Sequence, residues 1–526
     1  MVNNPLQALI EQKFALKPTD EQSKAVEMFV DFCVSRHPDT LFLLTGYAGT
    51  GKTTLVGAIV KAMLEMKQRV VLLAPTGRAA KVFSLHADMP ASTIHRRIYR
   101  ETMGVEIRQE AIDAADDTSL DASTTSTFAR NASTYSLNPG KLNHQTLFIV
   151  DEASMIANEG LSGGMFGTGR LLDDLIQFVY GGENCRLMLI GDSAQLPPVG
   201  EEQSPALSPE ALAGYGLQVM HSHLTEVVRQ AHESGILWNA TMLRNLIHTD
   251  DMFQFPRLNV APFADIEVVM GNELIECLED SYYHVGQDET IVVTRSNKRA
   301  NIFNLGIRGR ILGYEEELSS GEQVIVVKNN YFWLKDHSAG QSVPSGTKAQ
   351  TASSVSPAAA PSPSSAPSFL ANGDLAVVRR FRNERSQYGF RFADAILELP
   401  DYDNMEVECT LLLDVLQAEA PALTVQQQDQ LFNAVWEDYP DITNRRTRMQ
   451  RIRDDIYYNA LQVKYAYAVT CHKAQGGQWA HVYIDQGYIT EDMLTPDYFR
   501  WLYTAITRAT EKVYLINWPK AQLTEK

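Results

Sequence analysis

The segment Gly46-Tyr-Ala-Gly-Thr-Gly-Lys52-Thr53 combines residue types that can bind a polyphosphate. It follows the apolar run 41–45 and precedes the helical pattern 53–64, which is the strand–loop–helix context of a phosphate-binding loop. Glycines let backbone N–H groups converge on phosphate oxygens, and the helix N-terminus adds partial positive charge. Lys52 is expected to reach the β- and γ-phosphates of ATP, and the Thr53 hydroxyl to ligate Mg²⁺. The expected nucleotide contacts are Gly46, Ala48, Gly49, Thr50, Gly51, Lys52, Thr53 and Thr54.

Two further strand-like runs end in polar residues suited to the same chemistry. The run 147–150 is followed by Asp151 and Glu152. Asp151 suits Mg²⁺ bound through water, and Glu152 suits a general base that orients and deprotonates the attacking water. The run 187–191 leads to Gln195, whose amide can sense the γ-phosphate from the same sheet edge. The sequence has no Asn-Lys-x-Asp motif of the kind that reads guanine, which favours ATP over GTP.

These residues require parallel sheets to hold them. Short apolar runs bounded by turn signals alternate with helical patterns, which predicts βαβ units in an α/β fold. The runs are 41–45, 70–74, 147–151, 187–191, 291–294, 482–485 and 513–516. The first four predict one sheet and the last three predict another, with a region of different texture between them.

The predicted domains follow from this arrangement. A first lobe is expected over residues 1–205, with an accessory insertion at about 100–142. A second lobe is expected over 206–305 and 455–526. An accessory domain fills 306–454. Two stretches, 113–136 and 338–368, are rich in small polar residues and are predicted to be unfolded surface insertions.

Composition predicts an ordinary soluble protein. The chain has 526 residues, of which 44% are apolar and 21% are charged. It contains neither an apolar run long enough to span a membrane nor a signal-peptide pattern at its beginning. The five cysteines are scattered, which argues against disulfides and metal knuckles and favours a cytoplasmic setting.

The net charge of −18 argues at face value against nucleic acid as a partner. Binding depends on the local field, however, and basic residues gather in 295–310, 379–391 and 445–453. Charge is therefore only permissive of a nucleic-acid partner.

The order of the motifs resembles that of superfamily 1 helicases, most closely the RecD-like and Dda-like branch, superfamily 1B. The resemblance extends from Gln22 to Arg508. Besides the loop and the acid pair, it rests on 17–22 (Q motif), 73–80 (motif Ia), 91–95 (motif Ib), 191–198 (motif III), 224–230 (motif IV), 469–476 (motif V) and 503–509 (motif VI).

The resemblance implies two RecA-like lobes with ATP between them and a small accessory β-barrel of SH3 type, announced by the turn Asn372-Gly373-Asp374. Gln22 would then bind adenine, and Gln475 and Gly476 would contact the nucleotide. Arg229 and Arg508 would reach the γ-phosphate from the second lobe.

The resemblance further implies an ATP-dependent DNA helicase moving 5′ to 3′ on single-stranded DNA, acting on tailed duplexes in replication, repair or recombination, in a bacterial or phage-type setting. The implied strand contacts are Pro75, Thr76, Thr93, His95, Thr294, Asn297, Thr470, His472 and Lys473. His95 and His472 lack partners at metal-ligand spacing, which argues against a metal role for them.

The sequence leaves alternatives open. The same motifs would serve a translocase that displaces proteins from DNA without unwinding it, or a nucleotide-gated DNA-binding switch. Gln478 departs from the family, in which many members carry a glutamate, and this makes one contact to the ribose or to Mg²⁺-bound water uncertain. The aromatics Tyr99, Tyr331, Phe332 and Trp333 can stack on bases, but core packing is favoured.

Overall fold

The computed structural model describes residues 5–14, 17–101, 135–138, 143–158, 167–227, 234–249, 252, 254–334 and 369–524. The chain divides into two compact units. The first comprises Met1–Glu317, Gln417–Pro421 and Tyr465–Lys526, and the second comprises Leu318–Leu416 and Ala422–Lys464. Among the described helices, none is long and apolar enough to cross a bilayer.

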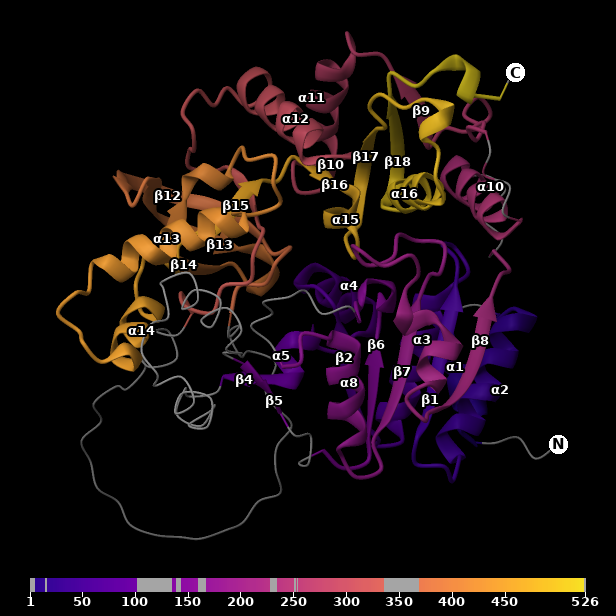
Figure 1. Cartoon of the computed structure of the whole chain (residues 1–526). Helices are drawn as coiled ribbons and strands as arrows, with labels where there is room; N and C mark the ends of the chain where they lie inside the picture. Colours follow the sequence, from indigo (N-terminus) through magenta and orange to yellow (C-terminus); the bar gives the residue numbers. More distant parts are fainter. Residues whose placement is uncertain are drawn as a thin grey trace, which may run out of the picture. The chain divides into compact units, whose positions relative to one another are not determined.

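The first unit contains two parallel sheets, as the sequence predicts (Figure 1). The first sheet has the strand order β3-β2-β6-β7-β1-β8. Its strands are β1 (Thr40–Gly46), β2 (Arg69–Ala74), β3 (Ala91–Thr93), β6 (Thr146–Val150), β7 (Arg186–Gly191) and β8 (Gln218–Leu224). The predicted end of the first lobe at residue 205 is wrong, because β8 pairs in parallel with β1. The segment QVMHSHL has no apolar run, since it forms a sheet edge, and so it gave no strand signal.

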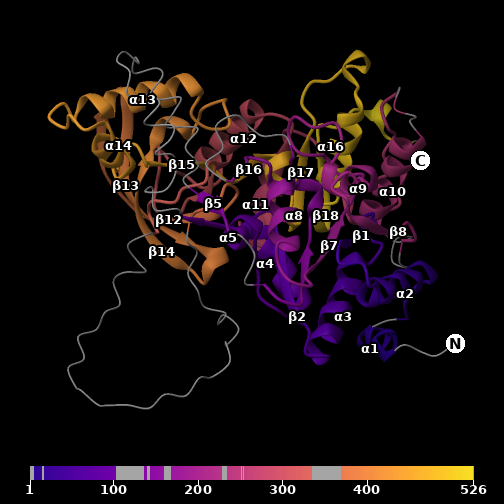
Figure 2. The ribbon, with the colours of Figure 1, turned by 60° about the horizontal axis from the view of Figure 1, so that its bottom comes forward.

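Helices cover both faces of this sheet. The helices α1 (Pro5–Lys13), α2 (Asp20–Val34) and α3 (Lys52–Glu65) bury apolar side chains against one face, together with Phe42 and Ile149 (Figures 1 and 2). Side chains alternate along a strand, so Phe148 points to the other face. There it meets Phe178 of α8 (Leu171–Tyr180) with ring centroids 5.6 Å apart. The remaining helices of this lobe are α4 (Gly77–Ala87), α5 (Ile94–Ile98) and α9 (Pro209–Ala213).

A small antiparallel pair of strands lies between β3 and β6 in the sequence. It joins β4 (Tyr99–Glu101) to β5 (Tyr135–Leu137). The prediction that 113–136 lacks regular structure is wrong at its end, because Ser136 lies in β5 and pairs with Arg100. The rest of that stretch, 113–134, lies outside the described residues.

The second sheet has the strand order β16-β10-β17-β18-β9, all parallel. Its strands are β9 (Ile266–Val269), β10 (Thr290–Thr294), β16 (Ala468–Thr470), β17 (Trp479–Asp485) and β18 (Ala509–Ile516). Helices α10 (Gly235–Thr249) and α16 (Pro496–Ile506) pack into one core with it. Helix α11 (Leu274–His284) covers the other face, where the Tyr483 hydroxyl donates to the Cys277 carbonyl at 2.6 Å.

Two more helices flank this sheet, namely α12 (Asn297–Arg310) and α15 (Cys471–Ala474). Short 3-10 turns of the chain are η1 (Ala153–Met155), η2 (Pro205–Leu207), η5 (Pro400–Tyr402), η6 (Leu413–Val415), η7 (Glu491–Met493) and η8 (Lys520–Gln522).

The second unit is a closed five-stranded barrel, which confirms the predicted accessory β-barrel. Its strands are β11 (Gln323–Val326), β12 (Leu375–Gln387), β13 (Phe390–Leu399), β14 (Met405–Leu412) and β15 (Leu461–Tyr465), accompanied by α13 (Val425–Glu437) and α14 (Arg445–Arg453). The predicted limits 306 and 454 are both wrong, because residue 306 lies within α12 of the first unit and β15 closes the barrel after 454.

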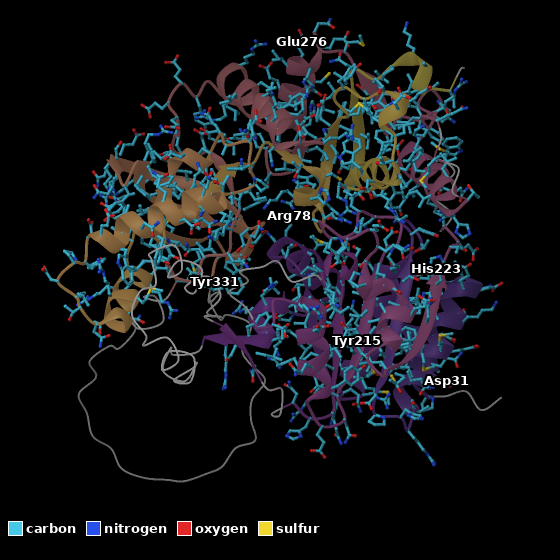
Figure 3. All side chains as sticks on the ribbon, in the orientation of Figure 1. Asp31, Arg78, Tyr215, His223, Glu276 and Tyr331 are labelled. Carbon is cyan, nitrogen blue, oxygen red and sulfur yellow. The ribbon has the colours of Figure 1, made fainter. Side chains whose placement is uncertain are left out.

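The chain enters β12 through the predicted Asn-Gly-Asp turn. Gly373 has φ of +100°, a conformation that glycine adopts without a Cβ penalty, and its N–H donates to the Val326 carbonyl at 2.9 Å. Tyr331, labelled in Figure 3, is buried and packs against Phe369 with ring centroids 4.6 Å apart. This contact confirms core packing for Tyr331. The stretch 338–368 lies outside the described residues.

Candidate nucleotide site between two sheets

The predicted catalytic residues of the first lobe gather at the carboxyl edge of its sheet. Strands β6, β7 and β1 are neighbours in that order, and the segments leaving them carry Asp151, Gln195 and the loop 46–53. In open parallel sheets this edge is where ligands bind.

The loop is shaped by its own backbone and by Lys52. Gly49 and Gly51 both have φ of +77°, a left-handed conformation that favours glycine. The Lys52 ammonium donates to the carbonyls of Gly46 at 2.6 Å and Tyr47 at 2.8 Å, which holds it inside the loop. Helix α3 begins at Lys52, so its free N–H groups point at the same space. The loop is thus built to hold phosphate oxygens.

The acid pair lies at the end of β6, and its geometry is unusual. Burial, together with the neighbouring charge of Glu152, raises the pKa of Asp151 to about 7. Glu152 itself has φ of +52°, rare for a residue with a Cβ. Its N–H donates to the Asp151 carboxylate at 2.9 Å. Strained backbone and crowded, half-buried acids are typical of functional sites.

A cleft of about 330 Å³ lies between this edge and the second sheet. The first lobe contributes Lys52, Thr53, Asp151 and Glu152 to its lining, and the second contributes Arg508 and the segment around Gly476. Arg508 is 3% exposed, and its guanidinium lies 3.7 Å from the Glu152 carboxylate. The predicted pairing of both lobes around one site is therefore present at Arg508.

Gln195 lies in the wall of this cleft with an unused polar atom. The side chain is buried, and its Oε1 has no hydrogen-bond partner in the described part of the chain. Buried amide oxygens are costly to leave unpaired, so this atom is suited to a ligand or to water within the cleft. Gln195 thus lies in the wall of the cleft, and its role as a γ-phosphate sensor stays a prediction.

Tyr503 is a site residue that was not singled out from the sequence. It comes from α16 of the second lobe, yet its hydroxyl accepts from the N–H of Ala48 in the loop at 2.8 Å and donates to the Asp192 carboxylate at 2.5 Å. Its place in motif VI, five residues before Arg508, was the available signal. One hydroxyl thereby joins the nucleotide loop to motif III.

Motif III is held by several groups of the second lobe. The Leu196 N–H donates to the Thr504 hydroxyl at 2.9 Å, and Arg500 donates to the Ser193 carbonyl at 2.5 Å. Gln475 Nε2 donates to the Leu196 carbonyl at 2.7 Å. Gln475 is buried and does not line the cleft, so its contact with the nucleotide stays a prediction.

Other predicted nucleotide contacts also have structural roles. Gly46 and Thr50 do not line the cleft, because Gly46 lies against Leu224 and the Thr50 hydroxyl donates to the Tyr47 carbonyl at 2.8 Å. Ala48, Gly49, Gly51, Lys52, Thr53, Thr54 and Gly476 do line it.

Gln22 is built into the start of α2. Its N–H donates to Thr19 Oγ1 at 3.2 Å, and its Oε1 accepts from the Thr19 N–H at 3.0 Å, which together form a capping box. Its Nε2 donates to the Thr50 carbonyl at 3.0 Å. One hydrogen of the Gln22 amide is left for adenine, and this contact stays a prediction.

Arg229 lies outside the described residues, but the chain leading to it is anchored. Glu21 accepts from the Thr225 N–H and hydroxyl, both at 2.6 Å, and from the Glu226 N–H at 2.8 Å. Burial alone would raise the pKa of Glu21, but these hydrogen bonds outweigh it and lower the pKa. The Q motif therefore holds the start of motif IV, a role that the sequence pattern did not predict.

The predicted strand-binding residues lie at the carboxyl ends of neighbouring strands in both sheets. Pro75 and Thr76 follow β2, and Thr93 ends β3 beside it. Thr294 ends β10, and Thr470 ends β16 beside it. Asn297 begins α12, and His472 and Lys473 lie in α15.

Three of these residues already make hydrogen bonds within the protein, and a fourth is uncharged near pH 7. Thr76 and Thr93 cap α4 and α5 by accepting from backbone N–H groups. Thr294 is fully buried, and its hydroxyl donates to the Ser296 carbonyl at 3.0 Å, so direct strand contact by this side chain is contradicted. Burial lowers the pKa of His95 to about 4, so its imidazole is neutral near pH 7 and is not a cation for phosphate.

Arg78 connects motif Ia to motif V and is labelled in Figure 3. It donates to the Gln478 carbonyl at 2.8 Å, and its guanidinium lies 4.1 Å from the centre of the Trp479 ring. Gln478 also lines the nucleotide cleft. The family departure at Gln478 thus lies where the two lobes meet.

This site and fold define a class of protein, the P-loop ATPases with two RecA-like sheets. Comparison with known proteins extends the identification. A model of the AAA domain matches residues 17–250, and a model of the UvrD-like helicase C-terminal domain matches residues 465–516.

The relatives differ in length. The chain is 27% identical over 301 residues to the ATP-dependent RecD2 DNA helicase of Deinococcus radiodurans, covering 55% of this chain and 34% of that protein. It is 23% identical to an uncharacterized protein of Methanocaldococcus jannaschii, covering 98% of this chain and 40% of that protein. An uncharacterized protein of Acanthamoeba polyphaga mimivirus is 20% identical, covering 91% of this chain and 96% of that protein. The chain thus spans well under half the length of the first two of these proteins.

A solved Pif1 helicase from Bacteroides, in complex with ADP-AlF3 and ssDNA, has 14% identity and a TM-score of 0.42, covering 97% of this chain and 95% of that one. The two domain models, the RecD2 relative and the ordered motifs support a superfamily 1B helicase of RecD or Pif1 type.

Proposed function

We propose that this chain is an ATP-dependent DNA helicase that moves 5′ to 3′ along single-stranded DNA. The observation that carries the proposal is the shared cleft, in which Arg508 of the second lobe approaches Glu152 of the first within 3.7 Å. A site divided between two lobes couples nucleotide chemistry to their relative movement. The polarity rests on the resemblance to superfamily 1B.

The chemistry follows from the lining of the cleft. Lys52 and the N-terminus of α3 would hold the β- and γ-phosphates, and Glu152 would orient the attacking water. Arg508 would stabilise charge on the γ-phosphate, a role worth about 10³–10⁵ in rate where arginine fingers have been measured. Thr53 and the half-buried Asp151 carboxylate carry oxygen atoms that fit Mg²⁺, which would neutralise phosphate charge when bound.

The strand would cross both sheets at their carboxyl edges. Motif Ia follows β2, motif Ib ends the edge strand β3 beside it, and motif V ends β16 at the edge of the other sheet. Hydroxyl and amide groups there would position phosphates without reading bases. Arg78 would carry changes in the cleft at Gln478 toward motif Ia.

Lys52→Ala tests the assignment of the cleft. We expect loss of ATP hydrolysis with single-stranded DNA binding largely retained, measured by phosphate production and by fluorescence anisotropy. Substantial hydrolysis by this variant would contradict the assignment.

Unwinding of 5′-tailed, 3′-tailed and RNA-containing duplexes tests the proposed helicase activity, its polarity and its preference for DNA. Strand release from the 5′-tailed DNA alone is the expected outcome. ATP turnover without strand release would identify a translocase that displaces proteins instead. Slow turnover that single-stranded DNA does not stimulate would identify a nucleotide-gated switch.

A further inference from the structure

A second cavity lies beside the nucleotide cleft. Its volume is about 280 Å³, many times the ~10–15 Å³ that one water molecule needs. Three residues line both spaces, namely Tyr47, Asp192 and Gln195. The two spaces therefore share a wall formed by the second residue of the phosphate loop and by motif III.

The second lobe places positive charge in this cavity. Arg244 of α10 and Arg500 of α16 both line it, along with His248. Arg244 donates to the Thr225 carbonyl at 3.0 Å and lies 4.6 Å from the centre of the Tyr47 ring. Among the described residues, no carboxylate lies within salt-bridge distance of either arginine. Each guanidinium carries five N–H donors, so donors remain after these contacts.

The first lobe contributes unpaired polar atoms and one carboxylate. Ser154 Oγ is buried and, within the described part of the chain, has no hydrogen-bond partner, and the same holds for Gln195 Oε1. The only carboxylate among the described lining residues is Asp192. Its two oxygens accept from the Tyr503 hydroxyl and from the Ala194 N–H, so both are engaged. The remaining surface attracts an anion.

We propose that this cavity is a transient binding site for inorganic phosphate leaving the ATP cleft past Gln195. The proposal rests on the proposed ATP hydrolysis. The covalent step occurs in the cleft, where water attacks the γ-phosphorus and the bond to ADP breaks, and only the free phosphate moves. Phosphate passing the γ-phosphate sensor enters a space in which two guanidinium groups lower its free energy.

Two variants test the site. Arg244→Gln removes one charge, and Ser204→Trp fills the cavity from its rim. Arg310→Gln removes a matched exposed charge from α12, outside the cavity. Rapid quenching measures phosphate formed, and a fluorescent phosphate sensor measures phosphate released.

In wild type and Arg310→Gln, release is expected to keep pace with formation. In the two cavity variants, phosphate forms at the wild-type rate but appears in solution about tenfold more slowly, equivalent to ~1.4 kcal/mol in the barrier. Arg244→Lys, which keeps the charge, restores release.

Release that keeps pace with formation in both cavity variants would overturn the proposal. So would a weakening of single-stranded DNA binding by Arg244→Gln without slower release, because the cavity would then bind backbone phosphate. Absence of phosphate formation in wild type would instead reject the proposed function, and rapid quenching detects this separately.

Discussion

Tyr503 offers the sharpest test of how the two lobes communicate. Its hydroxyl bridges Ala48 in the phosphate loop and the Asp192 carboxylate. Tyr503→Phe removes both bonds without changing the ring. A hydrogen bond to a charged group contributes ~1.5–3 kcal/mol, so kcat for ATP hydrolysis should fall about tenfold or more.

The control for this variant lies on the same helix. Tyr498 is equally buried, but its hydroxyl donates to Gln486 at 2.9 Å, and Tyr498 does not line the nucleotide cleft. Tyr498→Phe should lower the melting temperature and leave kcat near wild type. Equal losses of kcat in both variants would mean that Tyr503 acts only through stability.

At the scale of elements, the segment after β8 depends on Glu21. Glu21→Gln replaces a carboxylate that accepts three hydrogen bonds by an amide whose NH₂ cannot accept from N–H donors. The segment that continues to Arg229 should be positioned less well, and kcat should fall about tenfold, while Glu27→Gln on the exposed side of α2 should not change it. Steady-state kinetics at saturating DNA measure both, and unchanged kcat in Glu21→Gln would count against the anchor.

The turn into β12 predicts a pH dependence of stability. Burial raises the pKa of Asp374 from 3.8 to about 7. Between about pH 4 and 7 the folded state therefore binds more protons than the unfolded state, so stability falls as pH rises through this window. At pH 8, Asp374→Asn should unfold at a higher temperature than wild type, because its free energy of unfolding should be larger by about a few kcal/mol. This difference should vanish near pH 4. Thermal unfolding across this range measures it, and a difference that does not depend on pH would contradict it.

Elements also show what the sequence could predict. Buried parallel strands such as β1 and β6 are continuous apolar runs, so pattern alone located them and the chemistry at their ends. The edge strand β8 is polar, and β15 lies far from its barrel partners in sequence, so neither gave a local signal.

Side-chain roles were harder to predict, because they depend on contacts between segments that are distant in the sequence. Gln475 and Thr294 occupy motif positions, but tertiary hydrogen bonds turn them inward. Tyr503 and Glu21 became visible only when segments hundreds of residues apart met.

At the scale of the whole molecule, strand binding should depend weakly on salt. The net charge is −18, and the predicted contacts are mostly hydroxyls and amides, with Lys473 as their one lysine or arginine. Each phosphate neutralised on a single strand contributes about −0.7 to the slope of log K against log salt. We expect a slope of about −1 to −2 when the affinity for single-stranded DNA is measured by fluorescence anisotropy from about 50 to about 200 mM salt.

Lys473→Ala should make this slope shallower by about 0.7. A wild-type slope of about −5 or steeper would instead place the strand on arginine-rich segments such as α14.

The insertion of the barrel into the second lobe has a consequence for synthesis on the ribosome. Strands β9 and β10 are made before the barrel, but their sheet partners β16, β17 and β18 are made after it. The first sheet can close once residue 224 has left the ribosome, whereas β9 and β10 keep unpaired edges until residues 468–516 emerge. The nucleotide loop is therefore folded early, and the half of its site that contains Arg508 is completed only after the barrel has been made.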